Sequence, residues 1–208
     1  MTPNRTLRRA ASIWLRVLPA VFLMIWSGAA QAVTLTFDQY VNGADYGATT
    51  IATLEADDVA GGVQMTLTNT AVIGGMNAYV SQLLMTYQGV TSGLSLSNEA
   101  GVATTSFQDG SFLNAGFPFD LRIRWDETDP LTQLNIGESS TFTILGASIA
   151  DLFQSLPGTP FAMLQIKGLD NANATKYAAS FAPIPLPAAG LMLLVALGLL
   201  GVARRRQA

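Results

Sequence analysis

Apolar and polar residues alternate along much of the segment between residues 33 and 182. Alternation with a period of two predicts an extended strand with one buried face. The clearest example covers 117–125, and Pro118 places it at a strand start or a sheet edge. We expect the apolar residues to be buried and the arginines to be exposed; the apolar set is Phe117, Phe119, Leu121, Ile123 and Trp125, and the arginines are Arg122 and Arg124.

Other short segments show similar patterns and are separated by turn residues. Ala60-Gly61-Gly62 predicts a tight hairpin between two of them, because glycine adopts the positive φ that such turns require. The apolar run Leu83-Leu84-Met85 predicts a more completely buried strand. The expected strands are 33–37, 50–59, 63–69, 79–87, 92–97, 102–107, 117–125, 137–145, 161–167 and 177–181.

One segment, 146–156, has the spacing of a helix instead. Ile149, Leu152, Phe153 and Leu156 recur at intervals of three and four residues, and Pro157-Gly158 would end the helix. We therefore expect one short helix at 146–156. Nine or ten short strands with one small helix predict an all-β fold, an antiparallel β-sandwich of the jelly-roll-like kind.

The first 32 residues predict a secretory signal peptide. Arg5, Arg8 and Arg9 precede an apolar core at 17–26, and the small residues Ala30 and Ala32 flank Gln31 as in an A-x-A cleavage site. We expect signal peptidase to cleave before Val33. An uncleaved N-terminal anchor is disfavoured, because the core is short and contains Pro19.

The last 26 residues combine a proline motif, an apolar run and a basic tail. Leu186–Ala203 contains 18 uncharged residues, or roughly 27 Å of helix, which barely spans a membrane. Arg204, Arg205 and Arg206 should remain cytoplasmic, because flanking positive charge resists translocation. The chain is thus expected to comprise a signal peptide (1–32), one extracytoplasmic domain (33–182) and a C-terminal segment with a transmembrane helix (183–208).

Charge is distributed unevenly among these parts. The middle domain contains four basic residues and all 14 acidic residues, a net charge of 4 − 14 = −10, whereas the whole chain has −3. A strongly acidic surface repels phosphate backbones, so we expect no nucleic-acid partner.

The absence of two residue types narrows the chemistry. Without Cys and His, the chain has no disulfide, thiolate chemistry or Ser-His-Asp triad, and we expect neither enzymatic activity nor a cofactor. Asp126, Glu127 and Asp129 supply three carboxylates within four residues. They are a weak calcium candidate, since EF-hand spacing is missing, and a solvated loop is the favoured interpretation.

The C-terminal motif also resembles a known sorting signal. Ile184-Pro185-Leu186-Pro187-Ala188, followed by the apolar run and arginines, resembles the VPLPA-type variant of the PEP-CTERM signals of Gram-negative bacteria, with Ile184 in place of Val. The resemblance implies processing by an exosortase, a membrane-embedded enzyme. It also implies an inner-membrane intermediate, then a cell-surface or extracellular protein associated with exopolysaccharide and biofilm.

Segments 79–83, 117–121, 137–142 and 162–168 of the middle domain also resemble extracellular domains of PEP-CTERM proteins. Those domains often have a His near the position of Gln165, which this chain lacks. Leu186-Pro187-Ala188-Ala189-Gly190 offers a rival resemblance, to the LPxTG signal of sortase-anchored wall proteins, with Ala in place of Thr. A plain membrane anchor is a third alternative.

For the middle domain we favour a non-enzymatic surface or matrix protein. The alternative is a carbohydrate-binding module or, less favoured, a carboxylate-based glycan hydrolase, which would require two carboxylates about 5 to 9.5 Å apart in a cleft. The five tyrosines of the domain can stack on sugars or pack at strand ends. An aromatic-lined groove would favour carbohydrate binding, and a plain sheet surface would favour the structural role.

Overall fold

The structure is a computed structural model, which describes residues 32–47, 49–73, 77–154, 157–169 and 174–181. These residues form eleven strands, all paired antiparallel, and no helix. The predicted all-β, antiparallel class is confirmed. The strands are β1 (Ala32–Asn42), β2 (Ala52–Val59), β3 (Gly62–Asn69), β4 (Tyr79–Met85), β5 (Ser95–Gly101), β6 (Ser106–Asn114), β7 (Phe117–Arg124), β8 (Leu134–Asn135), β9 (Ser139–Leu145), β10 (Ala162–Lys167) and β11 (Thr175–Phe181).

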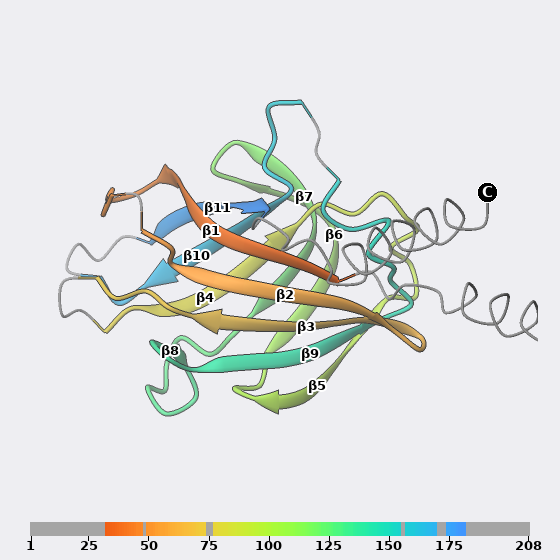
Figure 1. Cartoon of the computed structure of the whole chain (residues 1–208), viewed down its shortest axis with the longest axis horizontal. Helices are drawn as coiled ribbons and strands as arrows, with labels where there is room; N and C mark the ends of the chain where they lie inside the picture. The colour runs from red at the N-terminus through yellow and green to blue at the C-terminus, as the bar shows by residue number, and fades with distance from the viewer. Residues whose placement is uncertain (1–31, 48, 74–76, 155–156, 170–173, 182–208) are drawn as a thin grey trace, which may run out of the picture. The chain divides into compact units, whose positions relative to one another are not determined.

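The strands belong to one continuous sheet that curls until it nearly closes (Figure 1). Its order is β5-β9-β3-β2-β1-β11-β10-β4-β7-β6, and β8 pairs with β4. The two edge strands, β5 and β6, are joined by residues 102–105. The N–H of Val102 donates at 2.9 Å to Ser139 of β9, the strand next to edge strand β5, and the N–H of Thr105 donates at 2.8 Å to Arg124 of β7, the strand next to edge strand β6. This connection therefore bridges the two edges of the sheet.

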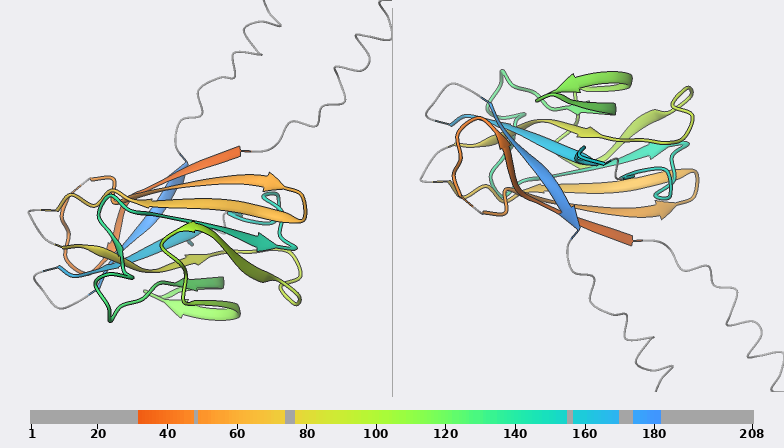
Figure 2. Two further views of the ribbon diagram at one scale, coloured as in Figure 1. Left: turned by 90° about the horizontal axis from the view of Figure 1, so that it is seen from below. Right: turned by 90° about the horizontal axis from the view of Figure 1, so that it is seen from above.

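Curling places β2, β3 and β9 opposite β10, β4 and β7, with the main core between these two layers (Figure 2). Trp125, just after β7, contacts Phe142 of β9 edge to face, with 6.1 Å between ring centroids. Both rings are buried. Stability therefore comes from apolar side chains that alternate inward from both layers.

Most predicted strands are present close to their expected positions. The β2–β3 hairpin has Val59 paired with Gly62, and Gly61 has the positive φ of 89° that the turn requires. Every residue of β4 except Tyr79 is buried, as its apolar centre predicted. The two-residue strand β8 was not predicted, because its sequence is too short to show a period.

The predicted burial is confirmed for four apolar residues of the segment 117–125, which divide between two clusters: Phe119, Leu121, Ile123 and Trp125. Leu121, Ile123 and Trp125 lie in the main core, whereas Phe119 is buried in a separate cluster. The pairing of β6 with β7 contains a bulge here. Asp109 pairs with Leu121 and Phe112 pairs with Phe119, so this part of β6 has one residue more than the part of β7 opposite. Phe117 was predicted to be buried and Arg122 to be exposed, but both are half-buried; Arg124 is exposed as predicted.

The predicted helix at 146–156 is wrong for the residues that the structure describes, 146–154. Only a single turn forms, with Ser148 accepting from the backbone N–H groups of Asp151 and Leu152. Leu152 then makes a β-bridge with Tyr87, and Phe153 has a φ of 58°. The helical spacing instead serves a loop that directs Ile149, Leu152 and Phe153 into the core.

Both predicted targeting segments lie almost wholly outside the described residues. Ala30, the motif 184–188, the apolar run to Ala203 and Arg204–Arg206 are not described, while Ala32 begins β1 and pairs with Asp57. Within the described ranges, no helix is long and apolar enough to cross a membrane.

Candidate functional site

A second apolar cluster lies on the outer face of the β10-β4-β7 layer. Along β4 and β10, Leu83 and Leu164 point into the main core, so their neighbours Leu84 and Met163 point outward. Leu84, Met163 and Phe119 are nevertheless at most 1% exposed. The side chains that cover them are Val41 from β1 and Phe112, Ala115 and Phe117 from the β6–β7 hairpin. This set, the outer cluster, holds the hairpin against the outer face of the sheet.

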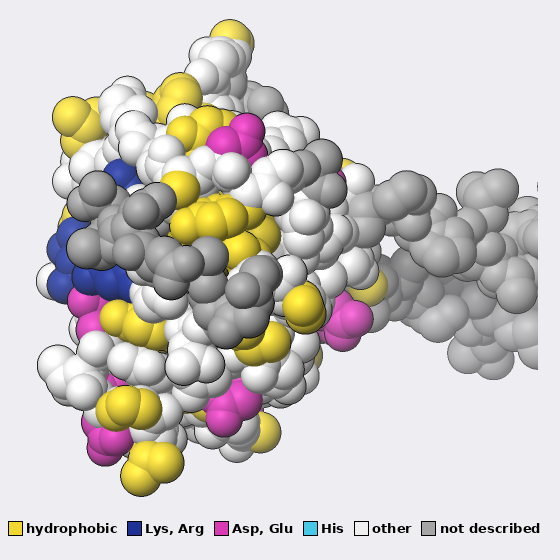
Figure 3. Space-filling view, turned by 90° about the vertical axis from the view of Figure 1, so that its left-hand side faces the viewer, with side chains coloured by type: hydrophobic (Ala, Val, Ile, Leu, Met, Phe, Trp, Pro, Cys, Tyr) yellow, Lys and Arg dark blue, Asp and Glu magenta, His cyan; other side chains and the backbone are white. Residues whose placement is uncertain are grey.

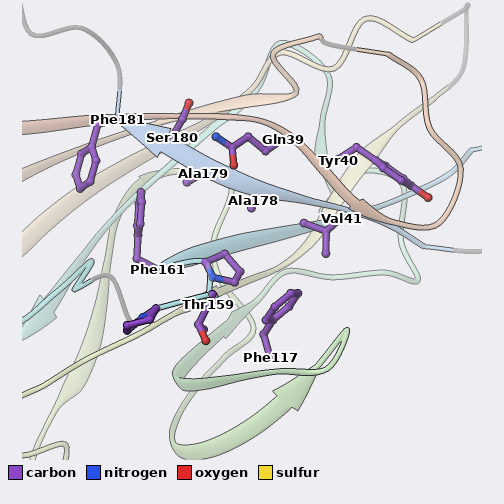
Figure 4. A pocket seen from close by; sticks show the side chains of 13 residues that line it. Gln39, Tyr40, Val41, Phe117, Thr159, Phe161, Ala178, Ala179, Ser180 and Phe181 are labelled. Atoms are coloured by element: carbon purple, nitrogen blue, oxygen red, sulfur yellow. The ribbon is translucent and has the colours of Figure 1, made fainter.

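A groove of about 550 Å³ opens beside the outer cluster (Figure 4). Residues 39–41 of β1 and 178–181 of β11 form its sheet side, and Phe117 and the loop 157–161 form the other side. Phe117 faces Val41 across it (Figure 4). None of the described residues that line the groove is charged. The groove is therefore a neutral surface on an acidic domain.

Aromatic rings stand at both ends of the groove. Phe161 and Phe181 are stacked at one end, with centroids 4.6 Å apart and ring planes at 23°. Phe181 is 55% exposed, so a broad apolar ring face is open to solvent. Tyr40 stands at the opposite end, where its hydroxyl donates to the carbonyl of Gly43 at 2.8 Å and its ring packs edge-on against Tyr177. These contacts hold the rings in place before any ligand binds.

Polar side chains accompany the rings. Gln39 contributes an amide, and Thr159 contributes a hydroxyl. The Ser180 hydroxyl donates to the Asp38 carboxylate at 2.9 Å and lies 2.9 Å from the Thr36 hydroxyl. Rigid rings with a few hydrogen-bonding groups are typical of sites that bind a neutral, amphipathic ligand.

A second hollow of about 840 Å³ adjoins the groove, and Tyr40 and Val41 line both. Lys176 lines this second hollow, together with Asn42, Gly43, Ala44 and Ala174. Moving from the groove into the second hollow, a ligand would pass from an uncharged surface to a cationic one.

The three carboxylates predicted as a calcium candidate each have a different partner. Asp126 accepts from the N–H and hydroxyl of Thr128 and from the hydroxyl of Thr132, at 2.7–2.8 Å. The Thr128 N–H first, and then these hydroxyls, lower the pKa of the Asp126 carboxyl well below its usual range.

The other two carboxylates of this loop, Asp129 and Glu127, also have partners within the protein. Asp129 accepts from the N–H of Leu131 at 2.9 Å, and Glu127 pairs with Lys167 at 2.5 Å. The described part of the chain contains no group of three or more side chains arranged to hold a metal ion. The structure thus does not gather the three carboxylates into one metal site.

Sequence patterns pointed to only part of the groove. Tyr40 is one of the tyrosines predicted to stack on sugars or pack at strand ends, whereas for Phe117, Phe161 and Phe181 the sequence predicts only positions in strands. The groove combines four segments that are far apart in the chain, and no local spacing connects them.

Comparison of the chain with protein-family models, with curated proteins and with solved structures found no match.

Proposed function

We propose that this chain is an exported, non-enzymatic surface protein whose β-domain holds a polysaccharide in the aromatic groove. The observation that carries the proposal is the exposed Phe181 ring, stacked on the buried Phe161 ring, in a groove whose described lining is uncharged. Sugar rings present apolar C–H faces and hydroxyl edges. The open face of Phe181 suits the first, and Gln39 and Thr159 suit the second.

The export, processing and final location that we propose are based on the two terminal segments of the sequence. A signal peptide at 1–32 and a sorting signal at 183–208 would export the chain, and an exosortase would process it at the motif 184–188. The final location would be the cell surface or the extracellular matrix of a biofilm. The two packed layers would act as a scaffold of the jelly-roll-like sandwich kind, which displays the groove on its outer face.

A binding role suits the groove better than catalysis. The residues of the lining that the structure describes include no carboxylate, and the chain contains no imidazole or thiol. A pair of carboxylates flanking a bound sugar, which glycoside hydrolysis requires, is therefore missing from the described lining.

The test is the affinity of the full-length chain, purified in detergent micelles, for a panel of soluble neutral glycans: a β-glucan, a mannan and a galactan. Phe181→Ala should weaken binding of the best glycan about five- to tenfold, because losing one stacked ring costs roughly 1–1.5 kcal/mol. Leu131→Ala is the matched control, since Leu131 is also exposed (90%) but lies away from the groove lining. Equal affinities for all three proteins, or no binding to any of the glycans, would contradict the proposal.

A further inference from the structure

We infer that a cationic row beside the groove is a second subsite, which selects polysaccharides bearing carboxylate groups. This inference rests on the proposed function and adds the charge of the ligand. The row consists of Arg124, Gln82, Gln165 and Lys176, on the neighbouring strands β7, β4, β10 and β11.

The strand register aligns these four residues. Arg124 pairs with Gln82, Gln82 with Gln165, and Gln165 with Lys176. Directly paired residues of an antiparallel sheet share a face. Their chain neighbours Ile123, Leu83, Leu164 and Tyr177 are buried in the main core, so the row lies on the outer face.

The centre of the row is rigid. Gln82 is only 5% exposed, and its amide donates to the side-chain oxygen of Gln165 at 2.8 Å. The two cations therefore flank a fixed pair of amides. Adjacent strands are about 4.8 Å apart, so Arg124 and Lys176, three strands apart, are separated by roughly 14 Å.

Charge is concentrated on this face. All four basic residues of the domain lie on it, because Arg122 pairs with the outward Leu84, and Lys167 forms part of the same outer surface beyond Gln165. On the side of the molecule seen in Figure 3, Lys and Arg side chains gather together, whereas Asp and Glu are scattered. A domain of net charge −10 thus has a local positive surface.

Two of these four cations are engaged by neighbours. Lys167 pairs with Glu127, and the Arg122 guanidinium lies 4.3 Å from the centre of the Phe112 ring and donates to Gln108. Burial, and then the nearby charge of Arg124, lower the pKa of Arg122. Among the described residues, neither Arg124 nor Lys176 forms a salt bridge. Within the described ranges, these two side chains are therefore the cations open to a ligand.

The row connects to the groove through Lys176. Lys176 lines the second hollow, which shares Tyr40 and Val41 with the groove. One extended polymer can therefore pack sugar rings against Phe181 and place carboxylates beside Lys176 and Arg124.

The spacing of the cations favours a sparsely charged polymer. A nucleic acid carries one charge per about 1.7 Å of duplex, far more than two cations roughly 14 Å apart neutralise. A polysaccharide with one carboxylate per sugar or fewer matches both the spacing and the adjoining groove.

The test compares polygalacturonate with the best neutral glycan on the full-length chain. The double variant Arg124→Gln/Lys176→Gln should weaken polygalacturonate binding about five- to tenfold at low salt and should leave neutral-glycan binding unchanged. Added salt should weaken polygalacturonate binding to the native protein more than to the variant.

Thr53→Glu/Ser95→Glu is the matched control, because it also changes the net charge by −2 but places the charges on β2 and β5, away from the row. The control should change polygalacturonate affinity less than twofold. Equal losses in the two double variants, or no loss in the first, would overturn the subsite. A native protein that binds the neutral glycan but not polygalacturonate would overturn the subsite alone. Binding of polygalacturonate that depends on the two cations, without binding of any neutral glycan, would support the subsite and contradict the neutral groove.

Discussion

Leu84→Ala tests whether the outer cluster fixes the β6–β7 hairpin and thereby one wall of the groove. The side chain is fully buried, although it points away from the main core. Replacing a buried Leu by Ala typically costs about 2–5 kcal/mol, depending on how far the site can collapse. Because a hairpin that can move inward covers this site, we expect a cost of about 2–3 kcal/mol. That is a large share of a typical stability of about 5–15 kcal/mol.

The control is Leu83→Ala at the adjacent position, which removes the same atoms from the main core. Urea unfolding followed by circular dichroism gives the free energy of unfolding, and hydrogen exchange with mass spectrometry locates the loss of protection. Leu84→Ala should accelerate exchange selectively in 106–119, whereas Leu83→Ala should lower protection throughout both layers. A cost below about 1 kcal/mol for Leu84→Ala, or unchanged exchange in the hairpin, would refute the role of the outer cluster.

Three further predictions concern the turns, the acidic loop and the sorting motif. Gly101→Ala should destabilise the fold by more than Gly93→Ala, as measured by urea unfolding. Both glycines have positive φ, but a Cβ on Gly101 would lie 2.1 Å from a β9 carbonyl oxygen, whereas a Cβ on Gly93 would meet open space. Equal losses of unfolding free energy in the two variants would exclude this steric argument. Because the folded pKa of Asp126 is lowered, its carboxylate stabilises the fold above its ordinary value of 3.8, and this stabilisation is lost as pH falls. Asp126→Asn should therefore lower the unfolding free energy at pH 7, with a difference that shrinks below pH 3.8, and a pH-independent difference would contradict the assignment. Pro185→Ala/Pro187→Ala should leave membrane insertion intact but block processing, so that intact-mass measurement finds full-length protein in the inner membrane. If the native protein keeps its arginine tail in a host with an exosortase, the C-terminal segment is a plain membrane anchor.

The success of the strand predictions and the failure of the helix prediction have related physical causes. Alternation in 117–125 and in 63–69 identified strands because one face of each packs on the core. The spacing of Ile149, Leu152 and Phe153 also reports burial, but a loop can bury three side chains without forming a helix. The β-bridge from Leu152 to Tyr87 depends on a partner 65 positions earlier in the chain, which local spacing cannot reveal.

The groove and the cationic row depend on strand order in the same way. Phe181 meets Phe161 only because β11 lies beside β10, and Arg124 aligns with Lys176 only through β4 and β10. The sequence does contain all the participating residues. Local sequence patterns do not reveal the strand register that brings these residues to one face. Counts of charged and aromatic residues therefore favour no particular surface as the binding site.

The most direct measurement of the central claim is hydrogen exchange of the full-length chain with and without the glycan that binds best. Binding should protect backbone amides in 39–41, 157–161 and 178–181, the segments that line the aromatic groove. Amides of β2 and β3, on the opposite layer, should exchange at unchanged rates. Protection confined to β2 and β3, or no protection under conditions where the glycan is bound, would contradict the assignment of the groove as the binding site.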